Sequence, residues 1–475
     1  MRFVDREKEL KELSEIEALS RKKLFVVALY GLRRVGKTRL LLEFLRVIGS
    51  SHGSGDGTRH GHGKRGLYFF VNKNKTSADL LNEFQGILKE LKLLGELENI
   101  ASWEKFFEVL IKRDSPPVVF DEFQNFAFVD PSAFGILQKT IDLNENEPSL
   151  IILSGSLIGL MKNLFKSSKE PLYGRIKRGF KLEPLSPSSC LELGKELKLS
   201  KEDLVKTYCI FGGYPKYFVA IEDFSLQGKK AEEIIDSLMF ARNAPLEDEV
   251  NSILSQEFGG RSGVYYSILE AIANGNNTSS LIAGALNTSP TSITRQIKEL
   301  KDYFELIEFE SPFEGKRGVY KIKHPLMRYW FSEIYKNYSD YASRKPEFMK
   351  KLKDNLNSVY GKAFEEVAKE FLVKELDLKE AKRQWGKIQD AKKGENAYEI
   401  DLIAKNERNA FAFEFKWSEL TNREASDALK ELEKKTSYLH KKPANLKLGL
   451  VAKKIEGKQK LKKEGFLVFE LEDLT

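Results

Sequence analysis

The stretch from Gly31 to Thr38 has the residue types and the spacing of a phosphate-binding loop. A glycine opens it, and Gly36, Lys37 and Thr38 close it. In such a loop, backbone N–H groups and the start of the next helix bind phosphate oxygens, the lysine reaches the outer phosphates and the hydroxyl is a magnesium ligand. The residues that we expect to contact the nucleotide here are Gly31, Leu32, Arg33, Arg34, Val35, Gly36, Lys37, Thr38 and Arg39.

The sequence on both sides of this loop predicts the elements that have to position it. Residues 24–29 are an apolar run that predicts a buried strand, and the leucine-rich segment up to Phe44 predicts a helix that starts without a break. A plain glycine turn in a strand–helix unit is the alternative. Strand, loop and helix in this order favour the phosphate site.

Two acids end another apolar strand downstream of the loop. Residues 118–120 are apolar, and Asp121 and Glu122 follow them directly. An ATP site needs an acid in the magnesium shell and a group that polarises the attacking water, and we assign these roles to Asp121 and Glu122. The alternative is a strand with a polar end, which the loop upstream disfavours.

Polar residues after the next apolar run are further candidates for contact with the nucleotide. Ser154 ends the strand predicted from residue 149, where its hydroxyl can touch the outer phosphate, although ordinary turn chemistry explains it equally well. Arg175, and with less support Arg178, can stabilise the charge on the transferred phosphate. A surface arginine is the alternative.

The last third of the chain holds a second set of residues with the types needed for metal-dependent chemistry. Alternating apolar residues predict two strands, 398–404 and 410–417, joined as a hairpin. The hairpin brings Asp401, Glu414 and Lys416 together, so the two carboxylates predict a magnesium site and the lysine orients or activates a water that attacks a phosphodiester. A solvated ladder of charges is the alternative.

Residues 264–331 predict three helices and a basic hairpin. The third helix starts at Ser289 and Pro290, an N-cap and an N1 proline. Its residues Ile293, Ile297 and Leu300 share one face, with Thr294, Arg295 and Lys298 outside. This arrangement is similar to a winged helix, with the third helix for the DNA major groove and the hairpin around 314–318 for the backbone. Use for protein contact, or as part of a lid, stays open.

Composition limits the class of protein. The chain has 475 residues, 41% of them hydrophobic, and a formal charge of +8, which leaves a basic surface open but does not argue strongly for nucleic acid. No apolar run is long enough for a membrane span and no secretory signal opens the chain, so we expect a cytoplasmic protein. The glycine-, serine- and histidine-rich segment 49–66 predicts a mobile loop.

Six segments occur in the order found in the archaeal ATPases of the AAA+/STAND class, and the chain resembles that family. They are FVDREKEL, GLRRVGKT, VVFDEFQ, ILSGS, LYGRIKRG and FGGYPKY. The resemblance implies a helical lid after the sheet, with Pro215 near the adenine. In nucleotide-binding proteins that open with such a pattern the first segment lies over the adenine, whereas a helix capped by Asp5 that packs on the next strand is the plain interpretation.

The C-terminal pattern resembles the PD-(D/E)xK restriction-endonuclease-like superfamily. In that resemblance Asp401 is the aspartate, Glu414 and Lys416 form the second motif, and Glu365 is the acid of the preceding helix. Ile400 stands where that family often has proline. The archaeal ATPase family also carries a C-terminal domain of this type.

Together these patterns predict an α/β protein of four parts. They are a P-loop NTPase domain with a parallel sheet (1–187), a helical lid (188–260), a winged helix (261–342) and a restriction-endonuclease-like α/β domain (343–475). The expected cofactors are ATP and Mg²⁺. One hypothesis is an ATP-regulated, DNA-associated protein with a Mg-dependent nuclease-like domain. The other is a STAND-type signalling switch whose C-terminal acids are inactive and which binds a protein partner. A homo-oligomer is expected in either case.

Overall fold

The computed structural model describes residues 3–51, 66–113, 115–259, 263–388, 396–441, 443 and 445–474. The chain forms two compact units. The N-terminal unit holds Asp5–Pro184 and Asp302–Glu305, and the C-terminal unit holds Leu185–Lys301 and the chain from Leu306 onwards. The boundaries predicted at 260 and 342 lie within the C-terminal unit and stay predictions.

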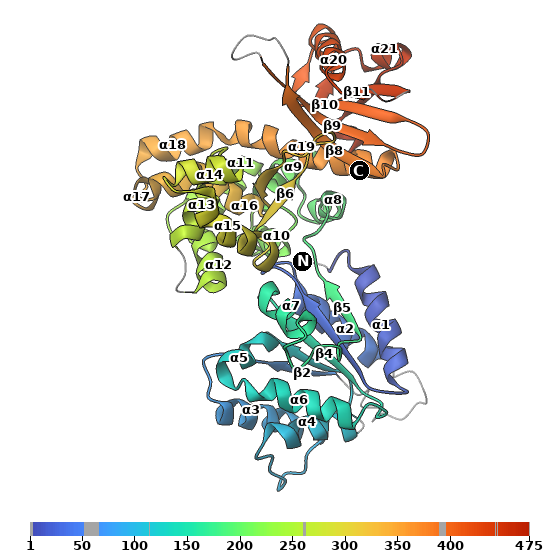
Figure 1. Cartoon of the computed structure of the whole chain (residues 1–475), viewed down its shortest axis with the longest axis vertical. Helices are drawn as coiled ribbons and strands as arrows, with labels where there is room; N and C mark the ends of the chain where they lie inside the picture. Colours follow the sequence, from blue (N-terminus) through green and yellow to red (C-terminus); the bar gives the residue numbers. More distant parts are fainter. Residues whose placement is uncertain are drawn as a thin grey trace. The chain divides into compact units, whose positions relative to one another are not determined.

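A five-stranded parallel sheet forms the centre of the N-terminal unit. Its strand order is β2-β3-β4-β1-β5 (Figure 1). The neighbouring strands pair in parallel, and most of their residues are buried, as expected for a sheet covered on both faces. The strands are β1 (Phe25–Tyr30), β2 (Leu67–Phe70), β3 (Val118–Asp121), β4 (Leu150–Gly155) and β5 (Arg178–Lys181).

Helices cover this sheet because each parallel strand pair needs a crossover connection. Right-handed crossovers place the helix after β1 on one face and those after β2 and β3 on the other. Phe69, Phe84, Phe106 and Phe120 stack in a buried aromatic cluster under the second group. The helices are α1 (Glu7–Ser20), α2 (Lys37–Ser51), α3 (Ser77–Glu90), α4 (Trp103–Lys112), α5 (Phe126–Val129), α6 (Ser132–Leu143) and α7 (Ile158–Lys166).

The start of α1 and the end of α2 differ from the predictions. Asp5 does not cap α1: the helix starts at Glu7, and its N-cap residue is Arg6, with a left-handed φ of 86° and no side-chain cap. Asp5 Oδ1 instead accepts the Arg6 N–H at 2.8 Å. The predicted loop 49–66 starts later than expected, since α2 continues to Ser51, and residues 52–65 lie outside the described part of the chain.

The C-terminal unit begins with short helices. They are α8 (Pro187–Glu196), α9 (Lys201–Phe211), α10 (Pro215–Asp223), α11 (Ala231–Ile235) and α12 (Glu249–Phe258). The predicted break at 211–215 is present, because Gly212 has a φ of 63° and Pro215 opens α10. His324 stacks on Tyr214 in this turn, with 3.9 Å between the ring centroids.

The predicted three helices and hairpin follow. They are α13 (Gly263–Ala273), α14 (Ser279–Ala285), α15 (Pro290–Lys298), β6 (Ile307–Glu310) and β7 (Val319–Ile322), and the two strands pair antiparallel. Ile293, Ile297 and Leu300 are buried, whereas Arg295 and Lys298 are exposed. The expected amphipathic division of α15 is therefore present, and its use for DNA stays a prediction.

A second five-stranded sheet, of mixed direction, ends the chain. Its order is β12-β11-β10-β9-β8, and Figure 1 shows α19 on one side and α20 and α21 on the other. The antiparallel pair β9–β10 is the predicted hairpin. The elements are α16 (Pro325–Tyr329), α17 (Tyr338–Ala342), α18 (Pro346–Asp354), α19 (Leu356–Glu375), β8 (Glu380–Lys387), β9 (Ala397–Lys405), β10 (Ala410–Leu420), α20 (Asn422–Thr436), β11 (Leu446–Ile455), α21 (Lys458–Lys463) and β12 (Leu467–Glu470).

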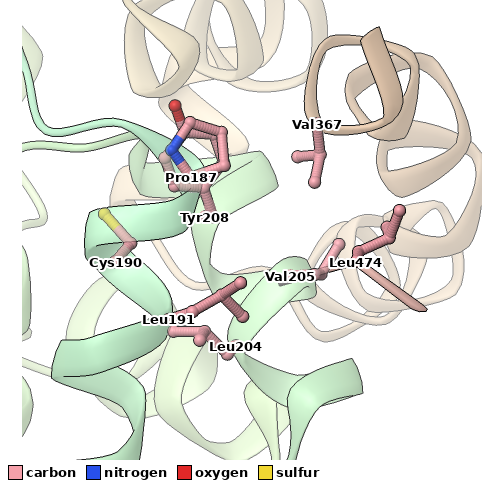
Figure 2. Close-up of a pocket in the computed structure, with 8 residues that line it drawn as sticks. All are labelled: Pro187, Cys190, Leu191, Leu204, Val205, Tyr208, Val367 and Leu474. Atoms are coloured by element: carbon pink, nitrogen blue, oxygen red, sulfur yellow. The ribbon is translucent and has the colours of Figure 1, made fainter. Parts of the chain in front are cut away.

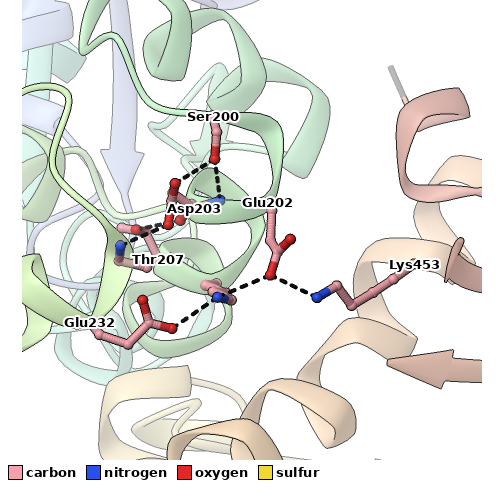
Figure 3. A network of polar contacts seen from close by, with 8 residues as sticks. Ser200, Glu202, Asp203, Thr207, Glu232 and Lys453 are labelled. Carbon is pink, nitrogen blue, oxygen red and sulfur yellow. Dashed lines mark hydrogen bonds and ion pairs between the residues drawn. The ribbon is translucent and has the colours of Figure 1, made fainter. Parts of the chain in front are cut away.

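Contacts along α9 make the helices and the last sheet one unit. Glu202 on α9 accepts from Lys453 on β11 at 2.8 Å, within the network of Figure 3. Lys206 bridges Glu202 and Glu232. Figure 2 shows the small apolar pocket at the same junction, lined by Pro187, Cys190, Leu191, Leu204, Val205, Tyr208, Val367 and Leu474.

Among the described residues, no helix is both long enough and apolar enough to cross a membrane.

Candidate functional site

The loop from Gly31 to Thr38 connects the buried end of β1 to the start of α2, as predicted. A Cβ at Gly31 would lie 2.3 Å from the Leu182 carbonyl oxygen, so only glycine allows this close approach. Arg34 and Gly36 have φ values of 72° and 93°. These left-handed residues curl the backbone so that its N–H groups can converge on an anion.

Lys37 is the first residue of α2 and is 6% exposed. Its Nζ donates to the carbonyl oxygens of Gly31 and Leu32 at 2.8 and 2.9 Å. The ammonium group therefore lies inside the curl of the loop, where a lysine meets the outer phosphates of a nucleotide.

Thr38 and Asp121 come together as the sequence predicts. The Thr38 Oγ1 donates to Asp121 Oδ2 at 2.7 Å, although the two residues are far apart in the chain. Tyr68 of β2 donates to the same oxygen at 2.8 Å. Burial and the charge of Asp121 raise the pKa of Tyr68, so its hydroxyl stays a donor. Sequence reasoning missed Tyr68, whose only signal was its place on the strand next to β3.

These two oxygen donors fit a magnesium ion. Mg²⁺ prefers oxygen ligands and, in phosphoryl-transfer sites, takes most of them from phosphates and water. Thr38 and Asp121 supply a hydroxyl and a carboxylate within 2.7 Å of each other at the mouth of the loop.

Glu122 lies beside this pair with its carboxylate held in place. Ser156 Oγ and Gln124 Nε2 donate to its Oε2 at 2.7 and 2.5 Å. Glu122 also has a left-handed backbone, with a φ of 54°. Because both donors bind Oε2, the other oxygen is the one that can face a water. Gln124 and Ser156 were not predicted; only their positions just after β3 and β4 could have indicated them.

Arg6 donates hydrogen bonds to the phosphate loop and to the segment after β5, a role that the sequence did not predict. Its Nη2 donates to the carbonyl oxygens of Glu183 and Val35 at 2.7 and 3.3 Å. Arg6 is 7% exposed and also pairs with Glu9 at 3.1 Å. One guanidinium thus ties the phosphate loop to the segment after β5.

Ser154 lies near the loop, at the carboxyl end of β4. It is opposite Leu29 in the parallel register of β1 and β4. Its hydroxyl is fully buried and has no hydrogen-bond partner among the described residues. A buried unpaired hydroxyl at this edge is consistent with the predicted phosphate contact, which stays a prediction.

Arg175 and Arg178 lie toward the amino-terminal ends of the parallel strands, away from the carboxyl end of β1 where the phosphate loop begins. Arg178 is in register with Val27, near the start of β1, whereas the loop follows the end of that strand. Arg175 precedes Arg178 and binds Asp142 with Nε and Nη2 at 3.0 and 2.9 Å. The structure therefore does not bring Arg175 to the phosphate loop. Residues just before β5 lie at the amino-terminal ends of the parallel strands. The phosphate loop lies at the carboxyl ends, so these residues cannot reach it.

Pro215 belongs to the C-terminal unit, where it is the first residue of α10. Its contact with adenine stays a prediction. Arg39 is exposed on the first turn of α2.

The C-terminal acids lie where the β9–β10 hairpin opens. The antiparallel pairing between the two strands ends at Phe413 and Leu402. Beyond it, Asp401 Oδ2 accepts the Phe415 N–H at 2.7 Å, so the Asp401 side chain replaces a ladder bond. Burial and the nearby charges of Glu414 and Glu365 raise the pKa of Asp401 to about 7.

Two lysines hold the Glu414 carboxylate. Lys416 Nζ is 2.9 Å from Oε1, as the shared strand face predicts. Lys435, at the end of α20, lies 3.1 and 3.0 Å from Oε1 and Oε2. Sequence reasoning missed Lys435, because the register of α20 on the sheet is not encoded in the hairpin.

Arg383 of β8 lies close to three further acids. Its guanidinium pairs with Glu399, lies 3.9 Å from Glu365 and 3.7 Å from Glu310. Burial raises the pKa of Glu365, and Glu399 adds to this rise against the lowering by Arg383. Within the described ranges, no group of three or more His, Cys, Asp or Glu side chains is arranged to hold a metal ion. The acids therefore do not fit the predicted magnesium site in this arrangement.

The hairpin loop 311–318, which we call the wing loop, docks on the last sheet. Phe313 N–H donates to the Arg383 carbonyl at 2.9 Å, and the Phe313 ring packs against the core cluster of β9, β10 and α20. Glu314 N–H donates to Gln384 Oε1 at 2.7 Å. The Glu314 carboxylate accepts the backbone N–H groups of His440 and Lys441 at 2.9 and 3.1 Å.

This docking limits the predicted contact of the hairpin with DNA. Only Gly315, Lys316 and Arg317 at its tip are exposed. The rest of the wing loop contacts the last sheet of its own chain, and the use of the predicted winged helix for DNA or for a protein partner stays a prediction.

Comparison with known proteins defines the class. Residues 3–221 match the family described as an ATPase domain predominantly from Archaea. Residues 330–428 match a second family, described as Archaea bacterial proteins of unknown function. The first match supports the predicted ATPase domain, and the AAA+/STAND assignment stays a prediction.

Two individual proteins are similar to the chain. The uncharacterized protein MJECL04 of Methanocaldococcus jannaschii is 29% identical over 483 residues, which cover 100% of both chains. The Walker-type ATPase PABY2304 of Pyrococcus abyssi has 21% identity and a TM-score of 0.51, over 69% of this chain and 96% of that one. The second likeness confirms the predicted α/β fold with a parallel sheet.

Proposed function

We propose that this chain binds and hydrolyses ATP with Mg²⁺ and that hydrolysis controls an association with DNA. The observation that carries the first part is the convergence of Lys37, Thr38, Asp121 and Glu122 at one edge of the sheet. These groups are the lysine, hydroxyl and two acids that phosphoryl transfer to water requires.

In this proposal each side chain has one task. Lys37 leaves the loop carbonyls to bind the outer phosphates, and Thr38 and Asp121 hold the magnesium shell. Glu122 polarises the attacking water through Oε1 while Gln124 and Ser156 fix its Oε2. The bound ion supplies charge neutralisation on the phosphates. Ser154 is a further predicted phosphate contact, and Pro215 a predicted adenine contact.

The DNA association rests on the helices α13–α15 and on the last domain. The exposed face of α15 carries Arg295 and Lys298, which suit phosphate contacts. We propose that Asp401, Glu414 and Lys416 form a nuclease-like site. Because they do not fit a metal ion as arranged, cleavage needs a rearrangement at Glu414.

A second function has a specific observation in its favour. The lysines at Glu414 and the lack of a metal-holding group among the described residues favour a domain that binds rather than cuts. The chain is then an ATP-controlled switch of the STAND type, with a protein partner for its C-terminal unit.

The test is ATP turnover by wild type and Lys37→Ala in Mg²⁺, with and without plasmid DNA. Turnover that is lost in the variant and stimulated by DNA supports the first function. Turnover that ignores DNA supports the switch. Wild-type protein that fails to hydrolyse ATP under all conditions contradicts both.

Plasmid nicking separates the two functions further. Under the first function, nicking requires metal, is lost in Asp401→Ala and is retained in Lys37→Ala. Under the switch function, wild type does not nick.

A further inference from the structure

The wing loop, residues 311–318, is bound by the last sheet and not by its own hairpin. All four residues of β6 pair with β7, so the hairpin ladder ends where the wing loop begins. The Phe313 N–H donates to the Arg383 carbonyl oxygen of β8 at 2.9 Å. The Glu314 N–H donates to Gln384 Oε1 of the same strand at 2.7 Å. The wing loop can therefore leave the last sheet while the hairpin stays paired.

Two side chains of the wing loop are bound in the manner of a peptide ligand. The Phe313 ring packs against the core cluster of β9, β10 and α20, and Lys405 Nζ lies 4.7 Å from the ring centroid. The Glu314 carboxylate accepts the N–H groups of His440 and Lys441 at 2.9 and 3.1 Å. An aromatic ring in an apolar site and a carboxylate on backbone donors are contacts that domains use to capture peptide segments. The wing loop is therefore an internal ligand of the last sheet.

The tip of the wing loop stays outside this contact. Gly315, with a φ of 103°, turns the chain there, and Lys316 and Arg317 are exposed. These two cations suit the phosphates of a nucleic acid. The seated loop presents only these two residues as cations, because the residues before them are bound to the last sheet.

The Glu314 carboxylate occupies donors that suit any oxyanion. Consecutive backbone N–H groups bind carboxylate and phosphate oxygens alike. His440 and Lys441 are themselves exposed, so a phosphate group can reach their N–H groups once Glu314 leaves. A nucleic acid thus offers a replacement for Glu314 at these donors and a partner for Lys316 and Arg317.

We propose that the wing loop makes an autoinhibitory contact: seated on the last sheet, it is withheld from nucleic acid, and a nucleic-acid phosphate releases it by replacing the Glu314 carboxylate on the His440 and Lys441 N–H groups. The inference rests on the DNA association of the proposed function, because it concerns the regulation of that association. The apparent affinity for DNA is then set by the fraction of molecules whose wing loop is released.

Loss of the Glu314 charge tests this contact. Glu314→Gln weakens both charge-assisted hydrogen bonds, so more molecules have a released loop and DNA should bind about tenfold tighter. Glu308→Gln is the matched control, since Glu308 is exposed on β6 of the same hairpin and its variant changes the net charge equally. The control should bind DNA as the wild type does.

A second variant releases the wing loop by a different route. Phe313→Ala should also tighten DNA binding by about tenfold, because the ring loses its apolar and aromatic contacts. Lys316→Met combined with Glu314→Gln should remove most of the gain, because the released loop then lacks a cation at its tip. The two releasing variants, Glu314→Gln and Phe313→Ala, keep the test valid if one of them fails to fold.

The experiment is titration of the full chain into a short fluorescein-labelled duplex DNA, followed by fluorescence anisotropy. Hydrogen exchange is measured on the same samples by mass spectrometry. In the wild type, DNA should speed exchange in the wing loop, because the Phe313 and Glu314 N–H groups lose their acceptors. The His440 and Lys441 N–H groups should stay protected, since a phosphate replaces the carboxylate.

The outcomes separate this inference from the DNA association itself. DNA binding that leaves exchange in the wing loop unchanged overturns the autoinhibitory contact and leaves the DNA association standing. A gain for Glu314→Gln no larger than that for Glu308→Gln does the same. If neither the wild type nor either releasing variant binds DNA, the DNA association is rejected, and the displacement with it. Binding by the releasing variants alone supports the proposal, because the seated loop then closes the wild type to DNA.

Discussion

The two acid-containing sites of this chain differ in what holds their carboxylates. In the N-terminal unit, Asp121 and Glu122 accept hydrogen bonds from neutral groups, the hydroxyls of Thr38 and Ser156 among them. In the C-terminal unit, Glu414 is bound by ammonium groups. Neutral donors leave the charge of a carboxylate available to a metal ion, whereas lysines neutralise it. The carboxylates of the N-terminal site are therefore available to a cation, whereas Glu414 in the C-terminal site already binds two ammonium groups.

The largest effect that separates the sites is expected from Lys37. Lys37→Ala removes the positive charge inside the phosphate loop, so ATP turnover should fall by about 10²-fold or more. Any plasmid nicking should persist, since Asp401 and Glu414 belong to another unit. Turnover is measured by phosphate release in Mg²⁺.

Arg175→Ala is the control for Lys37→Ala. Arg175 pairs with Asp142 at the far edge of the sheet, so this variant should keep wild-type turnover. A loss comparable to that of Lys37→Ala would restore Arg175 to the ATP site and contradict the geometry.

The next effect compares the acids directly. Glu414→Ala leaves Lys435 without its closest carboxylate partner in a largely buried place, so the free energy of unfolding should fall by about 3 kcal/mol. Asp121→Ala leaves two hydroxyls, which should cost about 1 kcal/mol.

Urea unfolding of both variants measures this difference. If the two losses are equal, the distinction between ammonium and hydroxyl partners has no energetic content.

His324, in the C-terminal unit, should lower stability as the pH falls, whereas Asp401 with its raised pKa acts in the opposite direction. Burial, with a smaller effect of the Arg328 charge, lowers the pKa of His324 to about 3. The folded state therefore resists protonation that the unfolded chain accepts below pH about 6.5. The stability that neutral His324 contributes is fully present above that pH and is lost as the pH falls toward 3, by about 2 kcal/mol at pH 5.

His324→Phe keeps a ring against Tyr214 and should remove most of this loss between pH 7 and pH 5. His440→Gln is the control, because His440 is exposed. Urea midpoints at the two pH values measure both. An equal acid loss in wild type and His324→Phe assigns the sensitivity to other groups.

Arg6 tests whether the phosphate loop is held by the rest of its own unit. Arg6→Ala removes the donor to the Val35 and Glu183 carbonyls, and nucleotide affinity should weaken about tenfold because the loop loses its support. Binding of a fluorescent ATP analogue measures the change. Arg178→Ala, on a surface pair with Glu12, should leave the affinity unaltered.

These partners show how far the sequence could be interpreted. The phosphate loop is contiguous, so the sequence from Gly31 to Thr38 predicted the loop together with its strand and its helix. Asp121 and Glu122 followed from a strand end. Arg6, Tyr68 and Lys435 were missed because each arrives from a distant element, and their contacts depend on tertiary packing. Arg175 lies away from the loop because it precedes β5. A residue before a parallel strand lies at the amino-terminal end of that strand, whereas a residue after it lies at the carboxyl end.

The smallest expected effect concerns the neutral donors themselves. Ser156→Ala removes one hydrogen bond to Glu122 Oε2 and leaves Gln124, so kcat should fall only about threefold while KM is unchanged. Ser149→Ala is the matched control, because Ser149 is buried just before the other end of β4 with a hydroxyl that has no partner among the described residues. A change in KM at constant kcat would mean that Ser156 contacts the nucleotide rather than orienting Glu122. In that case the Ser156 hydroxyl would not be what orients Glu122, and the contrast with the lysines at Glu414 would lose one of its neutral donors.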